Sequence, residues 1–293
     1  SRTIGIGPGD FAIIGPSWNG KLPQGIKEYK SPTNMVWIIG RTQTNYNDIS
    51  SVHAIQDQYK LTLLSDWSNS YVPSKNVAPV TKKDDESDKP PVQQIADLDT
   101  STFFNYLNTL MVNNPPADAD ANAMKLFSQI CVAPGQHFDL THFSNDVAEA
   151  IKRGACEGLN KITSTISSGS INNWSVMIDN MGQYGTDYLF RAYVAFMGLG
   201  ANLPKDAVYA SCRIDHDGNQ LTGKNKNRYT ISFARGETPP VKAFWSLTMY
   251  NDQQFFVSNK LSCYALGSRD DLKYNSDGSL TFYLQNDEPD NSE

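Results

Sequence analysis

The sequence predicts a multidomain protein of the mixed α and β class. A β-rich segment comes first, a helical domain follows, and an antiparallel β-sandwich or jelly roll ends the chain. Short apolar runs bounded by glycine and proline fill residues 10–42, and apolar side chains recur at helical spacing over 97–164. At least six strand patterns follow residue 207. The length of 293 residues is enough for two or three such domains.

The composition indicates a globular chain and disfavours several classes of partner. Hydrophobic residues make up 39% and charged residues 19% of the sequence, a balance typical of folded domains rather than disordered ones. The formal net charge of −6 argues against nucleic acid and anionic membrane as partners, because both select basic clusters. No apolar run reaches the roughly 18 residues of a transmembrane segment. We predict no cofactor and no metal.

The four cysteines, Cys131, Cys156, Cys212 and Cys263, are widely spaced and form no CxxC pair. Zinc-binding and thioredoxin-type sites are therefore disfavoured. The simplest interpretation is isolated core thiols. A disulfide between Cys212 and Cys263 on neighbouring strands is left open by the spacing.

The first segment, 1–67, is predicted to be β-rich. Apolar runs at 11–15 and 35–42 predict two strands, and the glycine and proline residues between them predict turns. A short helix is expected within 47–59. Residues 68–96 carry a nearly all-charged stretch and two prolines, so we expect a charged surface linker and a domain boundary there.

The helical domain is predicted to span 97–204. Its first helix is capped around Asp99 and stopped by the prolines at 115 and 116. A second helix is expected through 124–130, and a third from the Ser144 cap through 162.

A polar loop at 163–175 leads into the helix around which the chain is organised, 186–200. Thr186 or Asp187 can cap this helix, and almost every residue after the cap is apolar. We therefore expect it to be buried on all sides. Arg191 is its one central charge and follows Asp187 by four residues, a spacing that allows the two to pair.

The last domain, 205–293, is predicted to be an antiparallel sandwich or jelly roll. Its strand patterns occupy 208–214, 228–233, 241–250, 255–257, 263–266 and 280–285. The alternation of apolar and other side chains is clearest in 241–250. The Asp-Gly stretches at 215–219 and 275–278 resemble pieces of calcium loops, but the first lacks the glycine and glutamate of an EF-hand loop. Because Asp-Gly before a strand is typical of a hairpin, both are interpreted as turns.

Several motifs resemble one family. Residues 180–192 (Asn-Met-Gly-Gln-Tyr-Gly-Thr-Asp-Tyr-Leu-Phe-Arg-Ala), 239–250 (Pro-Pro-Val-Lys-Ala-Phe-Trp-Ser-Leu-Thr-Met-Tyr) and 274–281 (Tyr-Asn-Ser-Asp-Gly-Ser-Leu-Thr) resemble the signature of the carboxy-terminal DUF1214 domain. Residues 15–20 (Gly-Pro-Ser-Trp-Asn-Gly), 31–33 (Ser-Pro-Thr) and 37–42 (Trp-Ile-Ile-Gly-Arg-Thr) resemble the end of the paired DUF1254 domain.

The resemblance implies a layout for the whole chain. Residues 1–67 would be the carboxy-terminal part of a DUF1254-like β-sandwich, followed by the helical insert and a DUF1214-like jelly roll. It also implies that the start of the first domain and a final strand lie outside this sequence. Members are often exported bacterial proteins, with relatives in viruses. The resemblance therefore suggests a periplasmic or secreted protein, or a virion component, and it supplies no catalytic residues.

The leading functional hypothesis is binding of a small or carbohydrate-like ligand between the central helix and the jelly roll. The candidate residues combine a cation, a carboxylate and aromatic rings: Tyr184, Asp187, Tyr188, Arg191, Trp245 and Tyr250. Arg191 could hold a carboxylate or phosphate bidentately while the rings stack on a sugar. The alternative is structural, with Arg191 paired to Asp187 and to a strand carboxylate so that helix and sheet are locked together.

Two other functions stay open. A structural protein would form a homo-oligomer or lattice through sheet edges and loops, without catalysis. A hydrolase is the weakest hypothesis, because no GxSxG motif is present and only the carboxylates of Asp187, Asp215 and Asp217 are available. Arg269 and Asp270 are expected to form a polar pair on an exposed loop.

Overall fold

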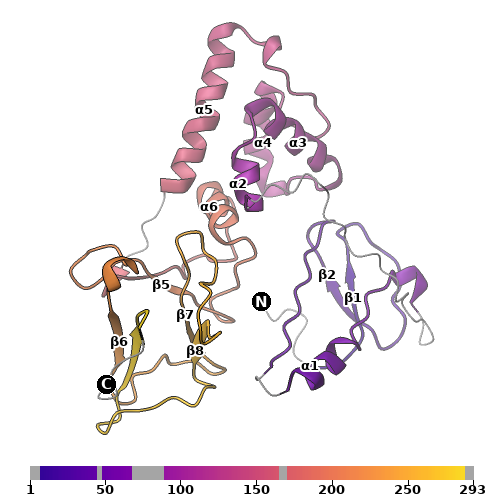
Figure 1. Ribbon diagram of the computed structural model, residues 1–293. Helices are drawn as coiled ribbons and strands as arrows, with labels where there is room; N and C mark the ends of the chain where they lie inside the picture. The colour runs from indigo at the N-terminus through magenta and orange to yellow at the C-terminus, as the bar shows by residue number, and fades with distance from the viewer. Residues whose placement is uncertain (1–6, 45–47, 68–88, 165–169, 288–293) are drawn as a thin grey trace. The chain divides into compact units, whose positions relative to one another are not determined.

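The computed structural model describes residues 7–44, 48–67, 89–164 and 170–287 (Figure 1). These residues are of the mixed α and β class, as predicted, and 32% of them are helical and 14% in strands, so helices predominate and the sheets are small. The chain divides into two compact units. Unit 1 comprises Ser1–Ser168 and Met177–Tyr209, and unit 2 comprises Gly169–Val176 and Ala210–Glu293.

Unit 1 begins with a pair of parallel strands, β1 (Phe11–Ile14) and β2 (Lys27–Lys30). The predicted strand at 11–15 is confirmed, and its alternate residues Ala12 and Ile14 are buried. The polar sequence of β2 gave no strand signal. The predicted short helix is also confirmed as α1 (Ile49–Gln56), which buries Val52.

The strand predicted at 35–42 is wrong. No strand forms there, and the apolar side chains of 35–39 are exposed. The segment is held by side chains instead: Asn34 Nδ2 donates to the Asn113 carbonyl at 2.6 Å. The Trp37 ring lies against Gly200, which has φ of 82° and where a Cβ would lie 2.2 Å from the ring, so only glycine fits. Apolar residues form a strand only where a neighbouring strand is available to pair with them.

The predicted linker 68–96 falls partly outside the described residues, which resume at 89. Its end forms a short helix, α2 (Pro91–Ala96), with proline at its first position.

All three predicted helices of the middle part are confirmed. They are α3 (Thr100–Asn113), α4 (Ala121–Phe127), which a 3₁₀ turn extends to Ile130, and α5 (Asn145–Ser164). Asp99 caps α3 through its Oδ1, which accepts hydrogen bonds from Ser101 N at 2.9 Å and Thr102 N at 3.0 Å. Their core is a cluster of Met111, Val132 and Phe138, surrounded by Phe104, Leu107, Met124, Ile130, Leu140 and Ile151.

Two asparagines on α3 hold the loop between α4 and α5, a role that the sequence did not reveal. Asn108 is fully buried; its Nδ2 donates to the carbonyls of Cys131 and Gln136, each at 2.9 Å, and its Oδ1 accepts from Ala133 N at 2.9 Å. One turn earlier, Asn105 bonds both the N–H and the carbonyl of Phe138. The loop thus obtains from side chains the backbone partners that a strand or helix would supply.

The central helix, α6 (Tyr188–Gly198), is present as predicted, but the expectation that it is buried on all sides is wrong. Only Tyr193 and Val194 are buried, while Ala195 and Leu199 are exposed. The helix packs against α5. An almost wholly apolar helix is therefore not always surrounded by other elements on all sides.

The described residues of unit 2 form three small antiparallel sheets. One holds β3 (Ser170–Ile171), β4 (Trp174–Val176) and β5 (Ala210–Cys212). The second pairs β6 (Tyr229–Phe233) with β9 (Leu280–Leu284), and the third pairs β7 (Ser246–Thr248) with β8 (Ala265–Gly267). Rings of Phe233, Trp245 and Phe282 pack together at centroid distances of 5.9 to 6.3 Å and form the core.

The strand predictions for unit 2 are partly confirmed. Of 241–250 only Ser246–Thr248 is a strand, and 255–257 contributes a single bridge between Tyr250 and Phe256. The stretch predicted as a loop, 163–175, contains β3 and β4, so that prediction is wrong where it is described. The sandwich and jelly-roll layout stays a prediction.

Both predicted turns are confirmed. Asp215 Oδ1 accepts from the N–H groups of Asp217 at 3.0 Å and Asn219 at 2.8 Å, and Asp277 Oδ1 accepts from Ser279 N at 2.9 Å. Each carboxylate thus satisfies the backbone of its own turn.

Three other expectations are corrected. All four cysteines are free, so the Cys212–Cys263 disulfide is absent, and Cys156 is exposed rather than a core thiol. Arg269 and Asp270 do not pair with each other. Arg269 lies 4.5 Å over the Phe244 ring, whereas Asp270 Oδ2 accepts from Gly267 N at 2.7 Å.

Candidate ligand-binding site

The candidate site in unit 1 is a polar cluster of Asp120, Tyr188 and Arg191. Asp120 ends a 3₁₀ turn, Asp118–Asp120, that follows the two prolines and leads directly into α4. This placement buries the carboxylate, whose side chain is only 12% exposed. A buried carboxylate requires a cation or hydrogen-bond donors nearby, and α6 supplies both.

Arg191 lies one turn into α6 and faces Asp120. Its Nη1 is 3.7 Å from Asp120 Oδ2, and its guanidinium carbon is 5.0 Å from the centroid of the Tyr188 ring. The Arg191 side chain is 46% exposed. The guanidinium is therefore fixed by a carboxylate and an aromatic ring on one side while much of it remains accessible to solvent.

Tyr188 completes the cluster at the first position of α6. Partial burial raises the pKa of its hydroxyl, and a hydrogen bond to Asp120 together with the charge of that carboxylate raises it further, against an opposing effect of Arg191. The hydroxyl therefore remains protonated at neutral pH and can donate to Asp120.

The predicted pair of Asp187 and Arg191 is wrong. Asp187 caps α6, and its Oδ1 accepts from Phe190 N at 3.1 Å. Capping turns the carboxylate toward the helix end, so Arg191 pairs instead with Asp120, from a distant part of the sequence. Tyr184 lies nearby, with its ring edge against Phe190 at 5.5 Å.

Asp187 also lines an open hollow of about 360 Å³ beside the start of α6, together with Asp179, Asn180, Leu189 and Phe190. The structure thus brings four of the six predicted residues, Tyr184, Asp187, Tyr188 and Arg191, to one end of this helix. Asp120 was missed, and its only sequence signal was an aspartate just before a helix.

The other two predicted residues belong to unit 2, where they have different surroundings. Trp245 packs in the core against Phe233 and Phe282. Tyr250 is exposed and stacks on Phe256 at 5.3 Å. Their participation in a site with Arg191 stays a prediction.

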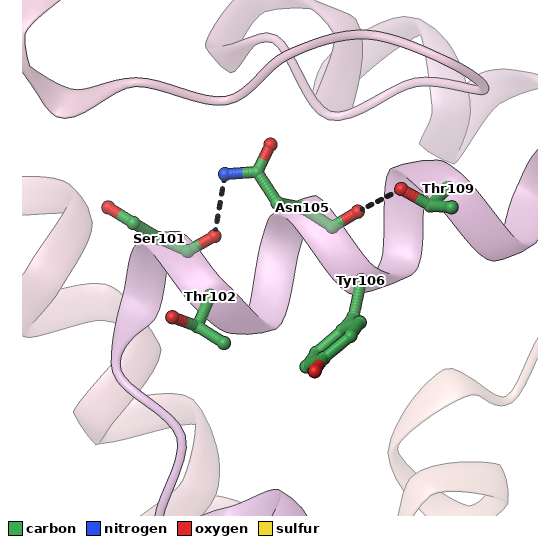
Figure 2. Close-up of a pocket in the computed structure, with 5 residues that line it drawn as sticks. All are labelled: Ser101, Thr102, Asn105, Tyr106 and Thr109. Carbon is green, nitrogen blue, oxygen red and sulfur yellow. Dashed lines mark hydrogen bonds between the residues drawn. The ribbon is translucent and has the colours of Figure 1, made fainter.

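A second hollow, of about 340 Å³, lies along α3 and is lined by Ser101, Thr102, Asn105, Tyr106 and Thr109 (Figure 2). Figure 2 shows two of its polar groups engaged by the helix itself: Asn105 donates to the Ser101 carbonyl and Thr109 to the Asn105 carbonyl. With no charged side chain and few free polar groups, this hollow offers little to orient a ligand.

Two of the carboxylates considered for hydrolysis serve local backbone structure, since Asp187 caps α6 and Asp215 holds its own turn. No group of three or more His, Cys, Asp or Glu side chains among them is placed to hold a metal ion. Hydrogen bonds, above all the one from the backbone N–H of Asn219, lower the pKa of Asp215. A lowered pKa suits a carboxylate that holds a turn better than one that acts as a general acid. None of the helices in the described ranges has the length and apolarity needed to cross a membrane.

Comparisons with known proteins match both ends of the chain. Residues 206–293 match the family described as protein of unknown function (DUF1214), and residues 1–63 match the family described as protein of unknown function (DUF1254). The resemblance predicted from the sequence is thereby confirmed. No curated protein matches the chain.

A solved structure shares the fold. The crystal structure of the VPA0106 protein from Vibrio parahaemolyticus is similar over 96% of this chain, with a TM-score of 0.60 and 22% sequence identity. The match covers 65% of that protein, so this chain spans about two thirds of its length. At such identity the similarity shows the fold alone.

Proposed function

The chain belongs to the family that pairs a DUF1254 domain with a DUF1214 domain, both of unknown function, and from that premise we propose that it binds a small anionic ligand such as a sugar acid. Arg191 is the anchor, and Tyr188 is the adjoining ring. The proposal retains the predicted β-sandwich and jelly roll as the wider layout of the two domains. It also retains the predicted localisation, in which the protein is exported and is periplasmic, secreted or part of a virion.

The observation that carries the proposal is the incomplete pairing of Arg191. At 3.7 Å its Nη1 is too far from Asp120 for a hydrogen bond, and its guanidinium donates no hydrogen bond to any described residue. A guanidinium has five N–H donors in a planar fork that matches a carboxylate or phosphate. Asp120 and Tyr188 hold this fork in position, so its ordering cost is reduced before a ligand arrives.

The test is calorimetric titration of the whole chain with a panel of monosaccharide acids and simple dicarboxylates. Arg191→Lys keeps the charge but loses the bidentate geometry, so the Kd of any bound acid should rise by about tenfold or more. Arg153→Lys, an exposed change on α5, is the matched control and should leave the Kd unchanged. Binding that Arg191→Lys leaves intact would reject Arg191 as the anchor.

A second candidate function, assembly into a homo-oligomer, is supported by a different feature. The consecutive apolar side chains Met35, Val36, Trp37, Ile38 and Ile39 are between 43% and 66% exposed. Soluble monomers rarely expose so continuous an apolar run. Sedimentation of the whole chain and of Ile38→Lys tests it: an oligomer that the substitution dissociates supports assembly, whereas a monomeric parent chain rejects it. Ile95→Lys, a change at a comparably exposed isoleucine on α2, is the control.

A further inference from the structure

Unit 2 carries a column of three stacked aromatic rings on its surface. The column consists of Tyr250, Phe256 and Tyr264. Tyr250 and Phe256 have ring centroids 5.3 Å apart and planes inclined by 21°. Phe256 and Tyr264 repeat this arrangement at 5.3 Å and 26°. Nearly parallel rings at this distance are offset, so part of each face remains uncovered.

The column is exposed and separate from the core. Tyr250 is 54%, Phe256 57% and Tyr264 38% exposed. The core rings of unit 2 are arranged differently, with Phe282 meeting both Phe233 and Trp245 edge to face. Exposed rings that stack on one another rather than turn into the core present a broad, rigid apolar surface to solvent.

Two asparagine-centred turns fix the column. Asn251 Oδ1 accepts from Gln253 N at 3.0 Å and Phe255 N at 2.8 Å, which places Phe256 opposite Tyr250 across a backbone bridge. In the next turn, Asn259 Oδ1 accepts from Leu261 N at 3.1 Å and Cys263 N at 3.2 Å.

Asn259 Nδ2 also donates to the carbonyls of Val257 at 3.1 Å and Cys263 at 2.9 Å. This asparagine thus ties the segment after Phe256 to the segment before Tyr264. The three rings come from three separate segments, and the turns hold them in register before any ligand binds. Such preorganisation lowers the cost of binding.

From this geometry we propose that the aromatic column is a binding platform for neutral polysaccharide. The C–H faces of sugar rings pack against aromatic faces, and the hydroxyl groups of Tyr250 and Tyr264 can exchange hydrogen bonds with sugar hydroxyls. The platform lies in unit 2 and its ligand is uncharged, so the inference goes beyond the anion site at Arg191 and is independent of it.

The local charge favours neutral polysaccharide over single-stranded nucleic acid, which also stacks on rows of aromatic rings. Residues 249–267 include one acidic residue, Asp252, and one basic residue, Lys260, and the whole chain has a formal net charge of −6. A single-strand platform requires a basic groove to neutralise the phosphates. A neutral surface on an acidic protein fits an uncharged polymer instead.

Affinity electrophoresis of the whole chain tests the proposal. Native gels contain hydroxyethylcellulose, soluble starch or laminarin as neutral probes, and polygalacturonate or single-stranded DNA as anionic probes. We expect at least one neutral polysaccharide to retard the chain. Tyr264→Ala and Phe256→Ala should each raise the Kd by about tenfold or more, whereas Phe256→Tyr, which keeps the ring, should bind like the parent chain.

Two controls keep the result specific. Tyr274→Ala removes a tyrosine that is 55% exposed and outside the column, and it should leave the retardation unchanged. Arg191→Lys should also leave it unchanged, which separates this platform from the proposed anion site. Far-ultraviolet circular dichroism checks that Phe256→Ala folds; if it does not, the more peripheral Tyr264→Ala decides.

Three results would overturn the proposal. The first is no retardation by any neutral probe, and the second is retardation that Tyr264→Ala does not weaken. The third is a concentration-dependent dimer that Tyr264→Ala dissociates while no polysaccharide binds, which would make the column a contact between two copies of the chain.

Discussion

At the scale of single residues, Asn108 is a fully buried polar side chain that joins α3 to the loop between α4 and α5. Its three hydrogen bonds serve two carbonyls and one N–H of the following loop, and the side chain has no exposed surface. Asn108→Ala removes the side-chain partner of all three backbone groups, so we expect a loss of about 3 kcal/mol in the free energy of unfolding, measured by urea denaturation.

Thr109→Ala is the matched control for Asn108, because the next residue on the same helix is exposed and its hydroxyl bonds only the Asn105 carbonyl. Its effect should stay within about 0.5 kcal/mol. Equal losses in the two variants would show that the three buried hydrogen bonds of Asn108 contribute no more than the single exposed one of Thr109.

The cap of α3 predicts a pH dependence. Hydrogen bonds from the Thr102 side chain and then from its backbone lower the pKa of Asp99 in the folded chain. A lowered folded-state pKa means that the cap stabilises the chain above the unfolded value of about 3.9 and that this contribution is lost as the pH falls through the folded value. Asp99→Ala should therefore be less stable than the parent chain at pH 7.

The difference between Asp99→Ala and the parent chain should stay constant above about pH 5 and shrink toward zero below about pH 4. Thermal unfolding across this range measures it. A difference that does not change with pH would mean that the charge of Asp99 contributes nothing to the cap.

Residue roles could be predicted from the sequence where their partners are local. Asp99 caps α3 as predicted, and Asp187, one of the two residues predicted as the cap of α6, is the cap, because a cap depends only on the next three residues. The partner of Arg191 could not be predicted in this way. Asp120 and Arg191 are brought together by tertiary packing within unit 1, and no spacing in the sequence indicates that contact.

At the scale of secondary-structure elements, β9 shows the alternation expected of a half-buried strand. Leu280 and Phe282 are buried while Tyr283 is exposed, and Phe282 joins Phe233 and Trp245. Phe282→Ala should lower the free energy of unfolding by about 3 kcal/mol, because it leaves a cavity among these rings. Guanidinium denaturation followed by tryptophan fluorescence measures this change.

Tyr283→Ala is the neighbouring control on the opposite face of β9. It should cost less than about 1 kcal/mol, because its side chain is already exposed. A larger cost for Tyr283→Ala than for Phe282→Ala would mean that the two faces of β9 have been assigned the wrong way round.

Helices could be predicted more completely than strands, for a physical reason. The proline stop after α3 and the caps of α3 and α6 act within a few residues. A strand also needs a partner elsewhere in the chain. Residues 35–42 have strand-forming side chains but no strand beside them, whereas polar β2 pairs with β1 despite its composition.

At the scale of the whole molecule, the units do not follow the family boundaries. The DUF1214 match begins at residue 206, yet unit 2 also includes Gly169–Val176 from before α6. This earlier segment supplies β3 and β4, and β4 pairs with β5 along Trp174, Ser175 and Val176. Without it, the first strand of the matched domain has no neighbour in its sheet.

The family domain alone should therefore be less stable than unit 2. Val176 and Ala210 face each other at one end of the ladder between β4 and β5, so an Asn-Gly turn can join them directly and replace 177–209. We expect this fused chain, 169–176 followed by the turn and 210–293, to unfold cooperatively and to give dispersed amide resonances. The fragment 206–293 should unfold at a midpoint at least about 5 °C lower, since β5 lacks its partner.

The comparison is made by thermal circular dichroism and by amide correlation spectra of both fragments at equal concentration. A fused chain in which Trp174 and Ser175 are replaced by prolines is the matched control, because proline removes the ladder hydrogen bonds while the added length stays the same. Its midpoint should fall to that of 206–293. If 206–293 already matches the intact fused chain, β3 and β4 contribute nothing to the domain and the family boundary is also the folding boundary.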